Sequence, residues 1–179
     1  MLNPTAAILI IGDEILSGRT RDSNMHYLSC ELTKIGIDLQ EARFIPDNAA
    51  KIIDAVRCLR SKYDYVFTSG GIGPTHDDIT ADCIAAAFET KISIREDAFK
   101  LLENYYSEQN IDFNSARQRM ARIPNGAKLI DNPISVAPGF YLNNVFVMAG
   151  VPNIFQSMVQ SILPLLLNGK PVLSKSVRI

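Results

Sequence analysis

The pattern of apolar and polar residues in the first part of the chain predicts alternating strands and helices. Residues 6–11 form a continuous apolar run ending at Gly12, which is typical of a strand buried on both faces of a parallel sheet. Over residues 24–35 the apolar positions recur every three or four residues, as on one face of a helix, and Gly36 follows as a stop signal. Partial alternation over residues 37–45 predicts a second strand.

The same alternation continues through the middle of the chain. Residues 52–59 have helical spacing, residues 65–68 predict a third buried strand, and residues 79–88 predict the next helix. This order favours an α/β fold with a doubly wound, mostly parallel sheet and right-handed crossovers. In such sheets ligands bind at the carboxyl ends of the strands, so we expect the site there.

The last part of the chain adds shorter elements to this domain, which we expect to cover residues 1–170. The pattern predicts a helix near residues 99–106, a short basic helix over 114–122, a strand over 127–130, an antiparallel hairpin of strands 140–142 and 145–148, and a last helix from 151 to about 167, interrupted or kinked at Pro164. The hairpin makes the sheet a mixed one. Residues 171–179 are typical of the start of a following segment, so we expect the natural chain to continue.

Composition narrows the class of protein. The 179 residues are 47% hydrophobic and 21% charged, which is average for a globular chain and fits one domain. A net charge of −1 and a pI near 6.1 give no general attraction to nucleic acid or to an anionic membrane. The apolar runs are far shorter than the roughly 18–20 residues that span a bilayer, and no secretory signal pattern is present. We therefore expect neither a nucleic-acid nor a membrane partner.

The three cysteines, Cys30, Cys58 and Cys83, are widely spaced and include no Cys-x-x-Cys pair. Their odd number and spacing argue against a disulfide framework and a zinc site, and favour a reducing, cytoplasmic location. Each lies among apolar residues of a predicted helix, so we expect all three to be buried, inert thiols. The histidines, His26 and His76, do not have the spacing of metal ligands.

The strongest candidate site is the segment over residues 68–80, TSGGIGPTHDDIT, between a predicted strand and a predicted helix. Gly70, Gly71 and Gly73 permit positive φ and close backbone approach, so that successive N–H groups can point at a phosphate. Pro74 stiffens the turn, and the following helix N-terminus favours an anion. The segment matches neither a Walker A loop nor a dinucleotide fingerprint. The alternative is a tight turn that binds no ligand.

Two carboxylates, Asp77 and Asp78, follow these glycines directly. They would repel a bound phosphate unless a divalent cation neutralised both, so the sequence predicts Mg²⁺ or a similar hard metal. The alternative for each residue is a helix-capping role without metal, because an acidic side chain in the first turn of a helix is stabilising.

Further polar residues follow the first two predicted strands. The first strand is followed by Gly12, Asp13, Glu14 and Ser17, and the second by Asp47 in a Pro-Asp step. Because the carboxyl ends of parallel strands share one edge of a sheet, we expect these residues to face the glycine loop across one crevice. Taken alone, Asp47 is better explained as an ordinary turn residue before a helix.

Arginines and a second loop complete the candidate residues. Arg117, Arg119 and Arg122 are predicted to form a solvated helix face, with contact to a ligand phosphate as the alternative. The segments 132–133, Asn-Pro, and 137–139, Ala-Pro-Gly, shape a loop that we expect to wall the pocket.

In combination these motifs resemble the molybdopterin-binding domain family, most closely its branch of competence/damage-inducible proteins, with the molybdopterin adenylyltransferases as more distant members. The matching segments are GDEILSG at 12–18, PD at 46–47, TSGGIGPTHDDIT at 68–80, NPISVAPGF at 132–140 and GVP at 150–152. They occur in the family's order and cover nearly the whole chain. As a set they are highly specific, whereas no single piece is.

The resemblance implies a three-layer α/β domain with a mixed sheet. It also implies that a pterin phosphate binds the loop over residues 68–75 and that Asp47 and Asp78 are the catalytic residues; these two and Asp77 are the expected metal ligands. The implied activity is divalent-metal-dependent cleavage of a nucleotide pyrophosphate of the ADP-ribose or FAD class. Two alternatives stay open: a module that binds molybdopterin or a nucleotide without turnover, and a molybdopterin adenylyltransferase of molybdenum cofactor biosynthesis.

The expected partner is a small phosphorylated pterin or nucleotide. We expect its site to be formed by Gly12, Asp13, Glu14, Ser17, Thr68, Ser69, Gly70, Gly71, Gly73, Pro74, Thr75, Thr80, Pro138 and Gly139. Family members commonly form dimers or trimers, and we expect a homo-oligomer here. The proposed contact surface is aromatic and consists of Tyr105, Tyr106 and Phe113.

Overall fold

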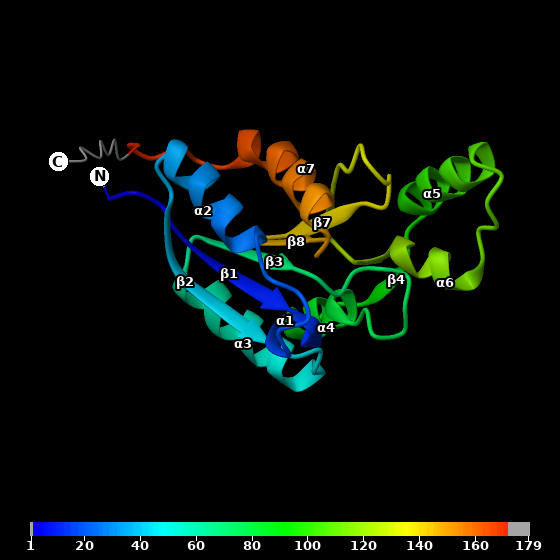
Figure 1. The fold of residues 1–179 in the computed structure, drawn as a ribbon, viewed down its shortest axis with the longest axis horizontal. Coiled ribbons are helices and arrows are strands. Elements are labelled where there is room, and N and C mark those ends of the chain that lie inside the picture. The colour runs from blue at the N-terminus through cyan, green and yellow to red at the C-terminus, as the bar shows by residue number, and fades with distance from the viewer. Residues whose placement is uncertain (1, 172–179) are drawn as a thin grey trace.

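The computed structural model describes residues 2–171 and contains a six-stranded sheet in the order β2-β1-β3-β8-β7-β6 (Figure 1). Its strands are β1 (Thr5–Ile11), β2 (Asp38–Ile45), β3 (Tyr65–Ser69), β6 (Lys128–Ile130), β7 (Gly139–Leu142) and β8 (Val145–Met148). The strands β2, β1, β3 and β8 are parallel, and β7 is antiparallel to both β8 and β6. The predicted doubly wound, mostly parallel sheet with an antiparallel hairpin is confirmed.

Helices cover both faces of this sheet and make the fold three-layered (Figure 1). One face carries α2 (Asn24–Lys34) and α7 (Pro152–Ile162), and the other carries α3 (Ala49–Lys62) and α4 (Thr80–Ala87). After α7 a short 3₁₀ turn, η2 (Leu163–Leu165), contains Pro164, so the helix ends where the sequence predicts an interruption.

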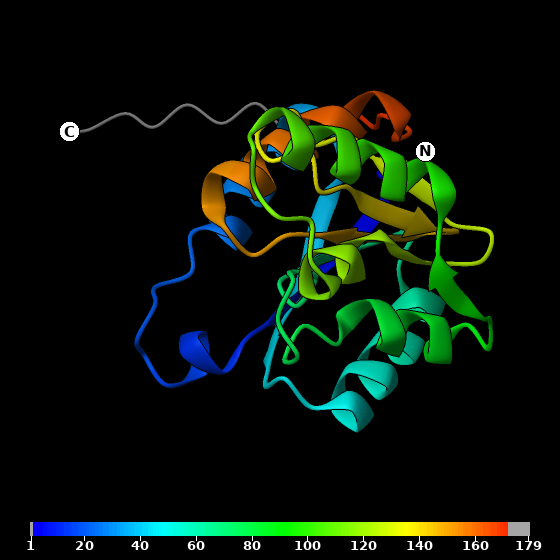
Figure 2. The same cartoon turned by 90° about the vertical axis from the view of Figure 1, so that its right-hand side faces the viewer.

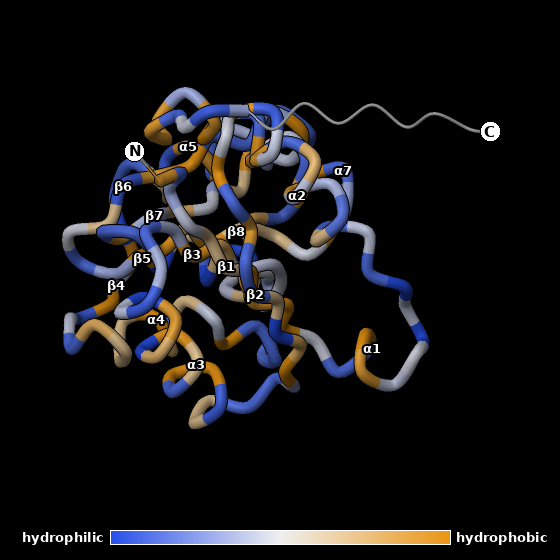
Figure 3. The backbone as a smooth tube through the Cα atoms, turned by 90° about the vertical axis from the view of Figure 1, so that its left-hand side faces the viewer, coloured by the Kyte–Doolittle hydropathy of each residue, from blue (hydrophilic) through white to orange (hydrophobic). Residues whose placement is uncertain are grey.

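The apolar run of β1 is buried on both sides, as predicted. Ala7, Leu9 and Ile11 pack into the core beneath α3 and α4, while Ile8 and Ile10 pack into the core beneath α2 and α7. The edge strand β2 instead alternates between exposed and half-buried residues. Figure 3 shows hydrophobic and hydrophilic colouring alternating along α3, as expected of a helix with one face on the core.

A small lobe lies beyond the carboxyl ends of the parallel strands, at the right of Figure 1. It contains α5 (Glu96–Glu108), α6 (Ser115–Gln118), a 3₁₀ turn η1 (Arg119–Ala121), and the antiparallel pair β4 (Ile92–Ile94) and β5 (Arg122–Pro124). The predicted basic helix over residues 114–122 is therefore wrong in its second half, because this segment turns through η1 and enters β5. The two strands of three residues were not predicted.

A short helix that was not predicted, α1 (Asp13–Leu16), follows β1. None of its residues is buried, and Figures 2 and 3 show it projecting from the body of the molecule together with the connection to α2. Within residues 2–171 no helix is long and apolar enough to cross a membrane. The segment expected to start at residues 171–179 lies almost wholly outside the described residues.

The prediction of three buried thiols is wrong for two of them. Cys83 is buried, and this burial raises the pKa of its thiol to about 11. Cys30 and Cys58 are exposed. Helical spacing alone misplaced them, since both lie at the solvent side of their helices; the Cys58 sulfur accepts a hydrogen bond from Arg43 Nη2 at 3.3 Å.

Candidate functional site

The carboxyl ends of the four parallel strands meet at one edge of the sheet. Ile11 lies opposite Ile45, Ile10 opposite Ser69, and Ser69 opposite Met148. The chain leaves these strands through α1, the Pro46-Asp47 step, the glycine loop and the Ala149-Gly150 step. The segments that the sequence analysis placed in one crevice therefore start from the same edge.

The glycine loop turns its carbonyl groups inward. The carbonyl oxygen of Gly70 accepts a hydrogen bond of 3.0 Å from Thr80 Oγ1, and that of Gly71 accepts one of 2.9 Å from the Thr80 backbone N–H. In a trans peptide the N–H points away from the carbonyl of the same peptide unit. The N–H groups of Gly71 and Ile72 therefore point away from Thr80, and neither has a backbone acceptor among the described residues.

Only glycine fits this path. Gly70 and Gly71 have φ of +108° and +72°, in the region that disfavours side chains. A Cβ on Gly70 would lie 2.2 Å from the carbonyl oxygen of Ile11, and a Cβ on Gly71 would lie 2.1 Å from Thr80 Oγ1. The loop is thus pressed against the end of β1 and the first residue of α4.

An acidic cavity of about 470 Å³ lies beside the loop. Its charged lining residues are Asp13, Glu14, Asp47, Asp77 and Asp78, with Arg19 and His76. Asp47 Oδ2 accepts a hydrogen bond of 3.0 Å from the backbone N–H of Asp13. Burial raises the pKa of Asp47, and the negative charges of Asp13, Glu14 and Asp78 raise it further, against the lowering effect of the Asp13 N–H. The field in this cavity therefore favours a cation.

Asp78 closes the turn after the glycines. Its Oδ2 accepts hydrogen bonds from the Thr75 backbone N–H at 2.8 Å and from Thr75 Oγ1 at 2.7 Å. The capping alternative for Asp77 and Asp78 is not observed, because α4 starts at Thr80 without a side-chain cap. Asp77 is exposed instead, with an oxygen 2.9 Å from Nε2 of His76.

A second cavity of about 510 Å³, lined mainly by apolar atoms, lies on another side of the loop. Its walls come from the glycine loop, from Tyr106 and Met120 of the small lobe, and from the loop after β6. That loop is held by buried Asn132, which donates to Ser135 Oγ and to the Ala137 carbonyl. The segment expected to wall the pocket does so.

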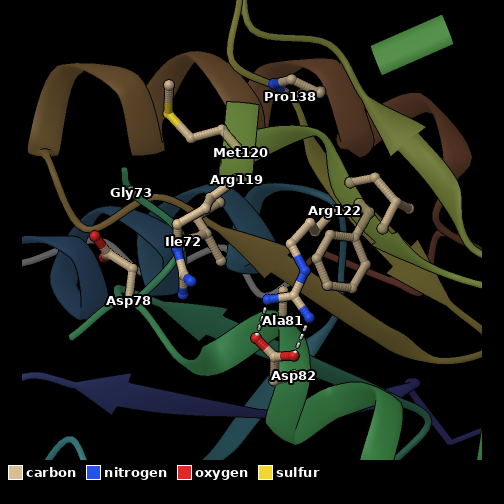
Figure 4. A pocket seen from close by; sticks show the side chains of 11 residues that line it. Ile72, Gly73, Asp78, Ala81, Asp82, Arg119, Met120, Arg122 and Pro138 are labelled. Atoms are coloured by element: carbon tan, nitrogen blue, oxygen red, sulfur yellow. Dashed lines mark hydrogen bonds and ion pairs between the residues drawn. The ribbon is translucent and has the colours of Figure 1, made fainter. Parts of the chain in front are cut away.

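A third, much smaller cavity of about 20 Å³ opens next to Asp78 (Figure 4). It is lined by Gly73, Asp78, Arg119, Arg122 and Pro138, among others. Asp78 lines all three cavities and is the residue at which they meet.

Not every predicted ligand-binding residue reaches these cavities. Thr68 and Thr80 are fully buried, and the Ser69 hydroxyl accepts a hydrogen bond from Asn24 Nδ2 at 2.8 Å, so they support the loop from behind. Gly139 is buried in β7, where a Cβ would lie 2.6 Å from the Val147 carbonyl oxygen. Ser17 donates to the Glu14 carbonyl and accepts from Arg19. The cavities are instead lined by Gly12, Asp13, Glu14, Gly70, Gly71, Gly73, Pro74, Thr75 and Pro138.

Sequence reasoning missed several residues of the site. Asn24 also donates to the Gly150 carbonyl at 2.8 Å, so it joins the ends of β3 and β8. Tyr106 was predicted to be exposed for assembly together with Tyr105 and Phe113, but all three are half-buried. Tyr106 stacks on Phe113 with ring centroids 5.5 Å apart. These rings therefore expose only part of their surface, and the oligomeric state stays a prediction.

Comparison with known proteins identifies the family of this domain. A family model described as "Probable molybdopterin binding domain" matches residues 7–168. The chain belongs to the molybdopterin-binding domain family. A protein of Metallosphaera sedula is 36% identical over 172 residues, which cover 93% of this chain and 65% of that protein. A protein of Caldivirga maquilingensis is 32% identical over 163 residues, covering 89% and 63%. The chain thus spans less than two thirds of the length of these relatives.

Solved structures place the chain near one branch of the molybdopterin-binding domain family. CinA from Thermoplasma acidophilum, a protein of unknown function, is 29% identical with a TM-score of 0.81, covering 90% of this chain and 97% of that one. MoaB from Thermus thermophilus, a molybdopterin biosynthesis enzyme, is 15% identical with a TM-score of 0.60, covering 91% of each chain. The likeness to MoaB shows a common fold. The likeness to CinA confirms the predicted branch, that of the competence/damage-inducible proteins.

Proposed function

We propose that this domain binds a phosphorylated nucleotide or pterin on the glycine loop and hydrolyses a phosphoanhydride bond in it with the help of a divalent cation. The observation that carries the proposal is the outward direction of the Gly71 and Ile72 N–H groups beside the carboxylates of Asp47 and Asp78. Amide groups fixed in this way bind phosphate oxygens. MoaB from Thermus thermophilus, which shares this fold, is a molybdopterin biosynthesis enzyme, and that supports a pterin ligand here.

The residues of the acidic cavity fit a hard divalent cation. Mg²⁺ in phosphate sites is usually bound by one or two carboxylates, with phosphate oxygens and water completing its shell. Asp47 and Asp78 supply such a pair. Burial raises the pKa of Asp47, and the neighbouring carboxylates, whose negative charge a cation would relieve, raise it further. Within residues 2–171 no group of three or more metal-binding side chains is already assembled. The cation would therefore arrive with the ligand's phosphates.

The chain's own groups have distinct tasks in this reaction. A bound cation supplies charge neutralisation and polarises the phosphoryl oxygens. The Gly71 and Ile72 amides stabilise the charge that develops on the oxygens of the attacked phosphoryl group. Water forms the new O–P bond, the bridging P–O bond breaks, and the proton of the water leaves to solvent. The apolar cavity beside Tyr106 holds the ring system of the ligand.

A binding module without turnover is the second candidate. The observation that favours it is the same lack of a preassembled metal cluster among the described residues. It shares the glycine loop and the apolar cavity with the first candidate, but it needs no metal.

Turnover assays separate these candidates. The wild-type protein is incubated with ADP-ribose, FAD or a pterin nucleotide and with Mg²⁺, Mn²⁺ or Co²⁺, and released mononucleotide is measured by chromatography before and after chelation. We expect metal-dependent release from at least one substrate. A protein that binds one of these compounds tightly without metal and releases nothing is the binding module. Binding itself is measured by thermal shift, since ligand at 100 times its Kd adds about 2.7 kcal/mol of stability.

A further inference from the structure

Three arginines lie close together in the sequence of the small lobe, and the structure gives two of them protein partners. Arg122 makes a bidentate ion pair with Asp82, at 2.6 Å and 2.9 Å. Arg117 donates to the Asp112 carbonyl and lies over the Tyr106 ring, with 5.0 Å from its guanidinium carbon to the ring centroid. Both guanidinium groups therefore already have protein partners, within the lobe for Arg117 and on α4 for Arg122.

Arg119 differs from its neighbours. It lies in η1 and is half-buried, and its Nε is buried without a hydrogen-bond partner among the described residues. Its side chain lines the small cavity together with Gly73 and Asp78. Figure 4 shows it reaching from η1 into the space between Asp78 and the Arg122–Asp82 ion pair. The buried Nε itself is out of a ligand's reach, but no hydrogen bond or ion pair holds the Nη groups of Arg119 among the described residues, so of the three guanidinium groups this one is left for an anion.

The position of Arg119 relative to the acidic cavity gives the site two sides. Asp47 lines the acidic cavity and Arg119 lines the small cavity, while Asp78 and residues of the glycine loop line both. A phosphoanhydride carries two phosphoryl groups, of which the loop amides bind one. The small cavity of about 20 Å³ has no room for a phosphoryl group, but Arg119 also lines a wider cavity of about 780 Å³ together with Pro74 and Thr75 of the glycine loop. The guanidinium group presents a planar fork of N–H donors that matches phosphate oxygens, so it can bind the second phosphoryl group there.

We propose that Arg119 binds the second phosphoryl group of a phosphoanhydride ligand. The inference rests on the proposed function, since it requires a ligand with a phosphoanhydride. It makes Arg119 the residue that distinguishes a diphosphate-bearing ligand from a monophosphate, because a monophosphate on the glycine loop leaves the guanidinium without an acceptor.

Binding of ADP-ribose and of AMP, each with Mg²⁺, tests this assignment by titration calorimetry on the wild type and on Arg119→Gln and Arg119→Lys. We expect Arg119→Gln to weaken ADP-ribose binding by about 10- to 100-fold, as for a lost charge-assisted hydrogen bond, and to leave AMP binding within about twofold of the wild type. Arg119→Lys keeps the positive charge but lacks the planar set of guanidinium donors, so its affinity for ADP-ribose should lie between those of the wild type and Arg119→Gln. The control Arg57→Gln, at an exposed residue of α3, should bind both ligands like the wild type.

The melting temperature of the ligand-free variants separates ligand binding from a structural role. If Arg119 binds only the ligand, the ligand-free Arg119→Gln variant should melt at the same temperature as the wild type or at a higher one, because the unpartnered N–H is removed. A clear fall in melting temperature, equal losses for AMP and ADP-ribose, or unchanged ADP-ribose binding would each overturn the assignment. If the wild type binds no ADP-ribose, the proposed function fails for this ligand class and the inference fails with it. If the wild type and Arg119→Gln bind ADP-ribose equally well, the inference alone is overturned.

Discussion

The carboxylate of Asp47 accepts a hydrogen bond from the backbone N–H of Asp13, which ties the chain after β2 to the start of α1. Asn at this position keeps an acceptor for that N–H but removes a charge whose pKa is raised by burial and by neighbouring carboxylates. A carboxyl group with a raised pKa in the folded state destabilises the fold above that pKa, and the cost disappears as the pH falls below its unfolded value. We expect metal-free Asp47→Asn to melt at or above the wild type at neutral pH.

This advantage should shrink as the pH is lowered through the pKa of Asp47, and Mg²⁺ with ADP-ribose should stabilise the wild type more than the variant. Thermal melts over the acidic and neutral range measure both effects. Asp54→Asn, which removes an exposed carboxylate from α3, is the control and should show neither. A clearly lower melting temperature for metal-free Asp47→Asn at neutral pH would contradict the account of the acidic cavity.

Asp78 and Asp77 are adjacent in sequence but differ in their surroundings, so their Asn variants should differ. Asp78 lines all three cavities, whereas Asp77 is exposed beside His76. We expect Asp78→Asn to lower metal-dependent turnover by about 100- to 1,000-fold, the range for loss of one electrostatic group from a transition state. Asp77→Asn should lose far less. Initial rates at saturating substrate and metal measure the turnover of both variants. Full activity in Asp78→Asn would show that Asp78 is not part of the catalytic site.

The Thr80 hydroxyl holds the glycine loop from behind, through its 3.0 Å hydrogen bond to the buried Gly70 carbonyl. Thr80→Val keeps the shape of the side chain and leaves that carbonyl without its donor. We expect it to destabilise the fold by about 1–3 kcal/mol and to weaken ligand binding. Thr80→Ser retains the hydroxyl and should bind the ligand nearly as the wild type does. Urea unfolding and calorimetry provide the measurements, and equal stabilities for Thr80→Val and the wild type would refute this role.

Glu41 on β2 makes the fold sensitive to acid far from the site. Tyr63 donates a 2.6 Å hydrogen bond to it, and Lys62 and Arg43 bind it as well, so its pKa falls from 4.5 to about 2. A lowered folded-state pKa stabilises the fold above the unfolded value of the group, and this stabilisation is lost as the pH falls towards about 2.

Glu41→Gln should therefore unfold more easily than the wild type at neutral pH, and the two should converge in strong acid. The effect is modest, because the side chain is partly exposed and solvent screens the charges. Urea unfolding followed by circular dichroism at several pH values measures it. The control Glu103→Gln, at an exposed residue of α5, should behave like the wild type at every pH. A constant difference from neutral pH down to strong acid would show that the effect does not come from ionisation.

The large elements of the fold were predictable because each one buries a pattern that the sequence displays. The run over residues 6–11 is apolar at every position since β1 has a helical layer on each face. The strands β4 and β5 have three residues each and pair with one another at the edge of the domain, so no periodicity reveals them. Helical spacing likewise does not show which side of a helix faces solvent, which is why Cys30 and Cys58 were misplaced.

The candidate site divides in the same way. Motif order and the rule for strand ends brought Asp47, Asp78 and the glycines to one edge. The direction in which each side chain points was not predictable. Thr80 was expected to touch the ligand, but in the structure its hydroxyl donates to the Gly70 carbonyl. The arginines at 117, 119 and 122 look equivalent in sequence. They are distinguished only by partners such as Asp82, which is 40 residues distant along the chain from Arg122.

The anchoring of the glycine loop also determines how it meets a ligand. Its carbonyl groups are held by Thr80, and the Gly70 N–H donates to the Met148 carbonyl at 3.1 Å. Ordering a mobile backbone costs about 1–2 kcal/mol per residue, and here that ordering is complete when the domain has folded. Association should therefore proceed without a slow rearrangement of the loop, at a rate governed by diffusion and by the approach of an anion past the acidic cavity. Any slow phase in binding would have to arise elsewhere, for example in the projecting segment that contains α1.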